Sequence, residues 1–393
     1  MKYDFDTPVI RRGTDSTKWT VGENELPMWV ADMDFKAAPE IIEALQKRLD
    51  HGVFGYAEIP GGWYDAYIKW WKTRHGFTMD KDGLIFCTGV IPAISSIVRK
   101  LTTPNENVLL LTPVYNIFYN STVNNGCRVV ECPLILNDGC YEIDFNDLEE
   151  KLSDPQTSLM ILCNPHNPVG KIWNRQTLER IARLAKKYGV TVVSDEIHCD
   201  LTMPGKEYIP FASVCEEARE ISITCIAPTK AFNLAGMQTA AVYVHDKFLR
   251  HKVWRALNTD EVAEPNSFAT TAAIAAFSYG GEWLDELRKY IFDNSKLVEE
   301  FIKDEIPELK VIHGEATYLR WIDISALGMP SKLFTETLRK KTGLFVTSGD
   351  VYGKGGEGFI RMNVACPRQV LNDGLNRLKL GVEIIKNRDN RLI

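Results

Sequence analysis

Two apolar runs separated by one stretch of helix length constrain the fold more than any other feature of this chain. Residues 158–163 and 190–194 are predicted strands, and residues 176–188 between them are a predicted helix. Two strands joined through one helix run parallel, so their carboxyl ends lie at the same edge of a sheet. In open parallel sheets, ligands bind in the crevice beyond that edge. The sequence therefore predicts an α/β fold with its site beyond these strand ends.

Polar side chains follow the predicted strands. Asn167 comes shortly after the first strand, and Asp195 and His198 come directly after the second. A third apolar strand, residues 221–227, is stopped by a proline and followed by Lys230. We therefore expect these four side chains to converge on one edge. The next apolar strand follows too soon for a crossover helix, so we expect it to run antiparallel to its neighbour.

Lys230 is the candidate for covalent chemistry. It is expected in a turn between buried elements, where an ammonium group loses part of its hydration and its pKa falls. A lowered pKa suits a lysine that forms a Schiff base. Because most lysines that follow strands are solvated surface charges, this interpretation depends on the neighbouring Asn167 and Asp195.

The three polar segments are Asn164-Pro-His-Asn-Pro-Val-Gly170, Ser194-Asp-Glu-Ile-His198 and Ala227-Pro-Thr-Lys-Ala-Phe-Asn-Leu-Ala-Gly236. They resemble the motifs of fold-type I pyridoxal-phosphate enzymes of the aminotransferase class I/II superfamily. Within this superfamily, the chain resembles the MalY/PatB branch of cystathionine β-lyases. Three further segments carry that narrower resemblance: Pro27-Met-Trp-Val-Ala-Asp-Met-Asp-Phe35, Gly52-Val-Phe-Gly-Tyr56 and Phe359-Ile-Arg-Met-Asn-Val-Ala-Cys-Pro-Arg368. The resemblance covers nearly the whole chain, with its motifs in order. It implies a mostly parallel seven-stranded sheet flanked by helices, with a smaller α+β domain.

A chain of 393 residues is longer than a single hydrophobic core usually accommodates, so more than one domain is expected. With the resemblance, we expect residues 1–48 to be an amino-terminal arm that forms part of a small domain. Residues 49–282 are the expected large cofactor-binding domain, and residues 283–393 the carboxy-terminal small domain.

Composition excludes several function classes. The net charge of -6 argues against a nucleic-acid surface, which needs a basic face. No apolar run approaches the ~20 residues of a membrane span, and the amino terminus lacks a signal-peptide core, so we expect a cytoplasmic protein with no membrane partner. Nine scattered cysteines without a C-x-x-C pair predict reduced thiols, with no disulfide framework and no metal site.

The resemblance implies pyridoxal 5'-phosphate as the cofactor, with Lys230 as its covalent attachment point. Asp195 is implied to pair with the ring nitrogen, Asn167 to donate to the phenolic oxygen, and Tyr115 to stack on the ring. His198 stands where many aminotransferases have a tyrosine that contacts the same oxygen. Its role stays open, because a structural histidine is an equal alternative.

A glycine turn that opens a helix is the predicted phosphate site. Gly89, Val90 and Ile91 are expected to present free N–H groups and the positive end of the helix dipole to the phosphate. The alternative is an ordinary strand-to-helix turn that binds no ligand. The resemblance adds the Thr229 hydroxyl, and Tyr56 from a partner subunit, which implies a homodimer with shared sites.

An amino acid is the implied small-molecule substrate. The resemblance places Arg361 on its α-carboxylate, which the planar guanidinium binds through two hydrogen bonds. It also places Ala31 and Tyr56 beside the substrate. A second arginine that holds the phosphate in many aminotransferases is replaced by Gln238, which carries no charge.

Three functions are compatible with this set of residues. The branch motifs favour a carbon–sulfur β-lyase that converts L-cystathionine or related cysteine S-conjugates to a thiol, pyruvate and ammonia. An aminotransferase of class I/II, acting on an L-amino acid and a 2-oxo acid, uses the same residues. A pyridoxal-phosphate-binding regulatory protein is the third alternative, and the complete catalytic set weighs against it.

Overall fold

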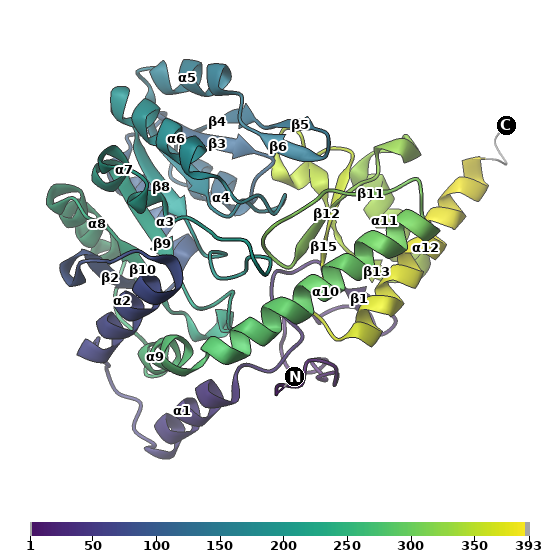
Figure 1. Ribbon diagram of the computed structural model, residues 1–393, viewed down its shortest axis with the longest axis horizontal. Helices are drawn as coiled ribbons and strands as arrows, with labels where there is room; N and C mark the ends of the chain where they lie inside the picture. The colour runs from purple at the N-terminus through teal and green to yellow at the C-terminus, as the bar shows by residue number, and fades with distance from the viewer. Residues whose placement is uncertain (1, 390–393) are drawn as a thin grey trace.

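The computed structural model describes residues 2–389 and contains two main sheets. In Figure 1 the larger sheet lies to the left and the smaller to the right, and the long helix α10 (Gly281–Glu305) runs below both. In spatial order, the larger sheet consists of β2 (Leu84–Cys87), β10 (Ala240–Tyr243), β9 (Ser222–Ile226), β8 (Thr191–Asp195), β7 (Thr157–Cys163), β3 (Asn107–Thr112) and β4 (Arg128–Pro133). Strand β10 is antiparallel to both of its neighbours, and the other strand pairs are parallel. The predicted seven-stranded, mostly parallel sheet and the antiparallel strand are confirmed.

Helices cover both faces of the larger sheet. One face packs against α3 (Val90–Leu101) and α8 (Lys247–Thr259). The other packs against α5 (Phe145–Ser153), α6 (Arg175–Lys187) and α7 (Glu216–Ile221). The remaining elements around it are α1 (Pro39–Asp50), α2 (Gly61–His75), α4 (Ile117–Val123), α9 (Ala269–Tyr279) and the hairpin of β5 (Ile135–Asn137) and β6 (Cys140–Glu142).

The strand–helix–strand unit forms for local reasons that the sequence shows. The side chain of Asn174 accepts a hydrogen bond from the Thr177 N–H and so caps the first turn of α6. The buried side chains of α6 recur at helical spacing, at Leu178, Ile181, Ala182 and Ala185. Strands β7 and β8 are almost entirely buried, as expected for parallel strands covered on both faces. The predicted unit is confirmed.

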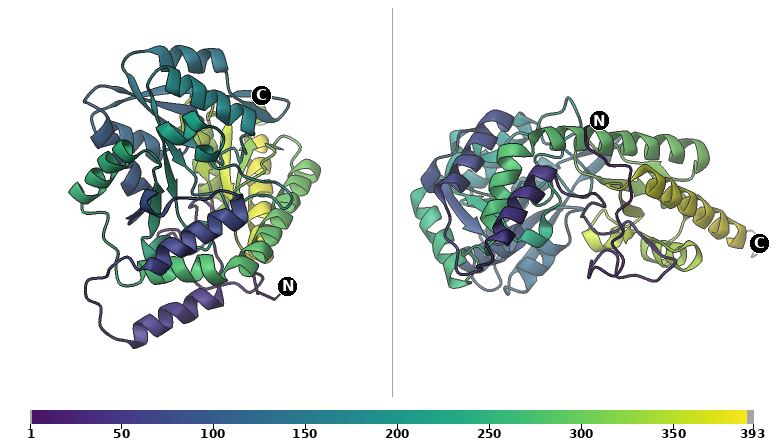
Figure 2. Two further views of the ribbon diagram at one scale, coloured as in Figure 1. Left: turned by 60° about the vertical axis from the view of Figure 1, so that its left-hand side comes forward. Right: turned by 90° about the horizontal axis from the view of Figure 1, so that it is seen from below.

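The smaller sheet is antiparallel. Its order is β11 (Lys310–Val311), β12 (Leu319–Asp323), β15 (Phe359–Asn363) and β14 (Thr347–Ser348). Helices α10 (Gly281–Glu305), α11 (Ser331–Thr342) and α12 (Arg368–Asp389) contribute to the same core. Both views of Figure 2 show α10 and α12 side by side along this part of the chain.

The apolar run Leu344-Phe-Val-Thr347 predicts a single strand, but the structure divides it between two sheets. Strand β13 (Leu344–Phe345) pairs with β1 (Leu26–Pro27) from the amino-terminal arm, and β14 pairs with β15. The chain changes partner at Val346, whose side chain is buried in the core of the smaller sheet.

The predicted domain boundaries after residues 48 and 282 stay a prediction, and the outermost residues of the two end segments, 1 and 390–393, lie outside the described residues. The amino-terminal arm reaches the smaller sheet through β1, while α1 packs against α9 beside the larger sheet. Across residues 2–389, no helix is both long enough and apolar enough to span a membrane.

Candidate active site

A cavity of about 280 Å³ lies beyond the carboxyl ends of the central strands. Strands β7, β8 and β9 end together there, because Asp195 is in register with Cys163 on one side and Cys225 on the other. All predicted site residues except Tyr56 and Arg361 line this cavity: Ala31, Gly89, Val90, Ile91, Tyr115, Asn167, Asp195, His198, Thr229 and Lys230. The cavity therefore brings together residues from six separate segments of the chain.

Lys230 lies in the turn after β9. Its Nζ donates a hydrogen bond to the carbonyl oxygen of Ala31 at 2.6 Å. Burial, together with the positive charge of Arg361, lowers the pKa of Lys230 to about 8. A larger fraction of this amine is therefore neutral at pH 7 than for a solvated lysine, and the neutral amine is the form that reacts as a nucleophile or base.

The residue that ends β8 is a buried carboxylate. Asp195 is 3% exposed, and its side chain accepts a hydrogen bond from the Ile197 N–H at 3.1 Å. Burial raises the pKa of Asp195 to about 7, against the opposing effects of that hydrogen bond and of the Lys230 charge. Within residues 2–389, no cationic side chain forms an ion pair with it. A buried carboxylate in this state is stabilised by a cation placed in the cavity.

Arg361 lies on β15 of the smaller sheet and borders the cavity through Asn167. Its Nη1 donates to the Asn167 Oδ1 at 3.1 Å, and its Nη2 donates to the Trp29 carbonyl oxygen at 3.0 Å. This contact leaves the Asn167 amide NH₂ as the donor available to the cavity. The Arg361 guanidinium is 5% exposed, and its Nε has no hydrogen-bond partner. In the described part of the chain it has no carboxylate partner, so it fits an anionic ligand.

His198 is neutral at physiological pH. Burial, then the charges of Lys230 and Arg361, lower the pKa of His198 to about 3. Its Nδ1 is buried without a hydrogen-bond partner, and its ring lies edge-on to Tyr318 at 6.1 Å between centroids. A neutral imidazole supplies a hydrogen-bond donor or acceptor but no charge.

The turn before α3 has the features of an anion site. Gly89 precedes the helix, and no side chain caps its first turn. The Ala93 N–H is bonded to the Gly89 carbonyl oxygen at 3.1 Å, and Pro92 has no N–H. The N–H groups of Val90 and Ile91 lie in the first turn of α3, which lines the cavity, and they are the donors that a helix start presents to an anion.

Some residues at the cavity are missing from the sequence-based prediction. Thr88, Pro92, Cys163, Ile197 and Ala235 line the cavity, as does Gln238. Cys163 and Ile197 could have been found by the rule that located Asp195, since they also lie at strand ends. Tyr318 gives no such signal: it lies directly before β12 of the smaller sheet, and its hydroxyl donates to the Ala31 carbonyl oxygen at 3.0 Å.

The amino-terminal segment that carries Ala31 is fixed by buried polar contacts. The Asn363 Nδ2 donates to the carbonyl oxygens of Val30 and Asp32, both at 2.6 Å. Arg11 and Lys18 form ion pairs at 2.7 Å with Asp34. The carbonyl oxygen that accepts from Lys230 is therefore held by several contacts on both sides.

Tyr56 does not reach the cavity of its own chain. It lies between α1 and α2, outside any helix or strand, and its side chain is fully exposed, at 105%. A role at the site therefore depends on a second chain.

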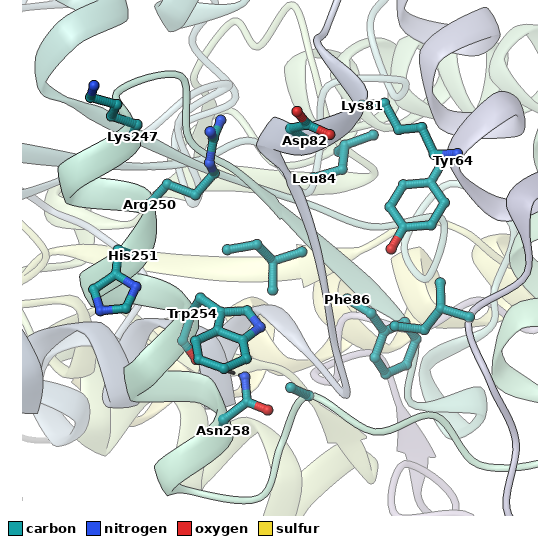
Figure 3. Close-up of a pocket in the computed structure, with 13 residues that line it drawn as sticks. Tyr64, Lys81, Asp82, Leu84, Phe86, Lys247, Arg250, His251, Trp254 and Asn258 are labelled. Carbon is teal, nitrogen blue, oxygen red and sulfur yellow. Dashed lines mark hydrogen bonds between the residues drawn. The ribbon is translucent and has the colours of Figure 1, made fainter.

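A separate cavity of about 650 Å³ lies between α8 and the start of β2 (Figure 3). Side chains of Arg250, His251 and Trp254 from α8 face Tyr64 and Lys81 across it. None of the predicted site residues lines it.

Comparison with known proteins agrees with the geometry. A family model described as aminotransferase class I and II matches residues 23–378. Cystathionine beta-lyase PatB of Bacillus subtilis is 44% identical over 382 residues, which cover 96% of this chain and 99% of that protein.

Two solved structures superimpose closely. Cystalysin from Treponema denticola, whose crystal structure contains a pyridoxal 5'-phosphate cofactor, has a TM-score of 0.95 at 36% identity, covering 98% of this chain and 100% of that one. The PLP-bound C-S lyase from Staphylococcus hominis has a TM-score of 0.91 at 32% identity, covering 97% and 99%. The protein described here is thus a member of the aminotransferase class I and II family.

Proposed function

We propose that this protein is a pyridoxal-phosphate-dependent carbon–sulfur β-lyase. Its substrates are L-cystathionine or related cysteine S-conjugates, and its products are a thiol, pyruvate and ammonia. The observation that carries the proposal is the single cavity that combines a low-pKa lysine, a buried carboxylate without a cation and an uncapped helix start. The lyase names of the relatives, which match nearly full length, support the reaction type.

The residues present fit the cofactor at each of its polar groups. The phosphate is assigned to the N–H groups of Gly89, Val90 and Ile91 with the Thr229 hydroxyl, and the ring nitrogen to the Asp195 carboxylate. The Asn167 amide donates to the phenolic oxygen, Tyr115 covers the ring, and the Lys230 amine is the point of covalent attachment. When bound, the cofactor withdraws electrons from the substrate Cα.

The protein side chains orient the substrate and move its proton. Arg361 binds the α-carboxylate, because its guanidinium is buried beside the cavity without an acidic partner. Lys230 Nζ takes the Cα proton, and its hydrogen bond to the Ala31 carbonyl oxygen aims the amine. Loss of that proton allows a thiolate to leave from Cβ, and thiolate is a better leaving group than hydroxide or carbon.

An aminotransferase remains the alternative, and the lining of the cavity favours elimination. No arginine lines the cavity in the structure of residues 2–389. Gln238, which does line it, has an uncharged side chain. A dicarboxylic 2-oxo acid acceptor would need a second cation near Arg361. A regulatory protein that only binds the cofactor would need no proton acceptor of lowered pKa such as Lys230.

The product pattern tests the reaction type. We expect purified protein incubated with cystathionine to release pyruvate over many turnovers without an added 2-oxo acid. L-alanine is the matched control substrate, because it presents the same α-carboxylate and Cα proton but has no leaving group on Cβ. Conversion of cystathionine to the 2-oxo acid that keeps its thioether, stopping at one equivalent per chain and resuming only when another 2-oxo acid is added, would show an aminotransferase.

A homodimer with shared sites is part of this proposal. Tyr56 is fully exposed at 105% and lies near other exposed apolar side chains, Val53 at 62% and Phe54 at 52%. The cavity in Figure 3 joins this region to α8, since Ile59 and Trp254 both line it. These side chains support an interface on this face, through which Tyr56 reaches the partner's cofactor phosphate. A cytoplasmic location also stays a prediction.

Mixing an inactive chain with an impaired one tests the shared site. We expect Lys230→Ala and Tyr56→Phe chains to regain activity when refolded together, because each mixed dimer contains one site with neither change. Each variant alone, refolded in the same way, is the control. A monomer by analytical ultracentrifugation, or a mixture no more active than Tyr56→Phe alone, would contradict the shared site.

A further inference from the structure

Three metal-ligating side chains meet outside the cofactor cavity, at the carboxyl end of α2. They are His75, Cys199 and Asp200, and their ligand atoms all lie within 4.8 Å of one another. The His75 Nε2 lies 2.9 Å from the Asp200 Oδ1. Two ligands about 2.0 Å from a tetrahedral zinc ion lie about 3.3 Å apart, so small shifts bring this group to the geometry of a metal site. We propose that these three residues bind a divalent transition-metal ion of the zinc class.

An unsatisfied carboxylate oxygen gives independent support. Asp200 is 5% exposed, and its Oδ1 takes both available donors, the Trp70 Nε1 and the His75 Nε2, each at 2.9 Å. Its Oδ2 is buried and has no hydrogen-bond partner. Leaving such an atom without a partner is unfavourable. A bound cation satisfies this oxygen and leaves the Trp70 hydrogen bond in place, while the His75 Nε2 gives up its proton and its hydrogen bond to Oδ1 in order to bind the metal.

The chemistry of the three ligands selects the metal. Thiolate sulfur, imidazole nitrogen and carboxylate oxygen together suit zinc, and they disfavour magnesium and calcium, which take oxygen ligands. A cavity of about 520 Å³ opens onto all three residues. It provides an entry path, and it leaves room for water as a fourth ligand.

Two arginines lie near the proposed site, and their positive charges repel a metal ion, but their own side chains are bound elsewhere. Arg288 donates to the carbonyl oxygen and hydroxyl of Thr202 at 2.9 and 2.8 Å. Arg74 is paired with Asp285 at 2.6 Å. Because Arg288 is close enough for its charge to interact with that of Asp200, we expect weaker affinity than at a three-ligand site without adjacent cations.

The position of the site gives binding a structural consequence. His75 is the last residue of α2, whereas Cys199 and Asp200 follow β8 and come directly after His198 of the cofactor cavity. A metal would therefore fasten α2 to the segment that carries Asp195 and His198. Since His75 is far in the sequence from the adjacent Cys199 and Asp200, the three ligands form no motif such as C-x-x-C, and the sequence predicts no metal site.

Cobalt titration of the purified holoenzyme tests the proposal. After chelator treatment and gel filtration, we expect one Co²⁺ per chain and a thiolate-to-cobalt charge-transfer band in the difference spectrum, both abolished by added Zn²⁺. Zn²⁺ should also raise the midpoint of thermal unfolding, because the assembled site binds it more tightly than the unfolded chain does. Cys199→Ser should remove the charge-transfer band, and Asp200→Asn should weaken binding at least tenfold.

Cys140→Ser is the matched control, because Cys140 is an exposed free thiol outside the cluster. This variant should bind cobalt like the parent. The proposal is overturned if the parent shows no charge-transfer band, if Cys199→Ser keeps it, or if Cys140→Ser loses it. Circular dichroism of each metal-free variant checks that it is folded, and His75→Gln replaces either ligand variant, Cys199→Ser or Asp200→Asn, if that variant is not.

Discussion

Replacing Lys230 with alanine is expected to abolish turnover, lowering kcat/KM by more than about 10³-fold. The substitution removes the amine that we propose accepts the Cα proton and attaches the cofactor. No other lysine lines the cavity in the described part of the chain, so no second amine is in place to substitute for it. The cofactor should still bind, because the groups assigned to its phosphate and ring nitrogen are unchanged.

Borohydride reduction followed by peptide mapping measures the attachment directly. The pyridoxyl label should appear on the peptide that contains Lys230, and it should be absent from Lys230→Ala. Lys252→Ala is the control, since Lys252 is exposed on α8; it should keep both label and activity. Label on any other lysine of the parent protein, or turnover retained by Lys230→Ala, would end this assignment.

The sequence predicts the parts of the site that depend on strand ends. Asn167, Asp195, His198 and Lys230 meet because parallel strands joined by helices end at one edge, and the apolar runs of β7, β8 and β9 are long enough to be recognised. The helix start at Gly89 follows from the same logic. These side chains line one cavity in the structure.

Contacts between the two sheets could not be predicted in this way. Tyr318 reaches the site through the Ala31 carbonyl oxygen, and Arg361 reaches it through Asn167. Each contact joins segments far apart in the sequence, and its geometry depends on how the smaller sheet packs. The contact between His75 and Asp200 at the proposed metal site likewise joins segments that are far apart in the sequence, so it could not be predicted either.

Weak local patterns explain the missing elements of the fold. Strand β4 has no place in the sequence-based prediction, because it lies at the edge of the sheet and carries Arg128 and Glu131 among its apolar residues. Strands β5 and β6 have three residues each, too few for a periodic signal. The division of residues 344–348 between two sheets depends on the amino-terminal arm, whose pairing with β13 is not encoded locally.

Asp195→Asn is expected to have opposite effects on activity and on the stability of the cofactor-free protein. In the holoenzyme, asparagine leaves the cationic ring nitrogen without its counter-charge, so we expect kcat/KM to fall by about 10²–10³-fold, the usual cost of removing one electrostatic contact in an active site. The cofactor should also bind less tightly. Asp65→Asn, at an exposed position on α2, is the control for both measurements.

The effect on stability has a defined pH dependence. Burial raises the pKa of Asp195 from 3.8 to about 7, so the folded cofactor-free protein holds this proton more tightly than the unfolded chain does. The stabilising contribution is fully present below the unfolded pKa and is lost as pH rises through about 7. Asparagine has no proton to lose, so the variant escapes this loss. Glu196, whose pKa burial also raises to about 7, is common to both proteins and cancels in their difference.

Thermal unfolding of the two cofactor-free proteins at acid and alkaline pH measures this difference. Near pH 4 the two should unfold at similar temperatures, because Asp195 is protonated in the folded state. At pH 8, the variant should be more stable by at most about 4 kcal/mol, which follows from a folded-state pKa of about 7 against 3.8. With saturating cofactor, the parent protein should be more stable than Asp195→Asn, since the cationic ring nitrogen pairs with the aspartate and has no such partner in the variant. Equal stability at both pH values would mean that Asp195 is already neutralised without the cofactor, and it would remove the physical basis for placing the ring nitrogen there.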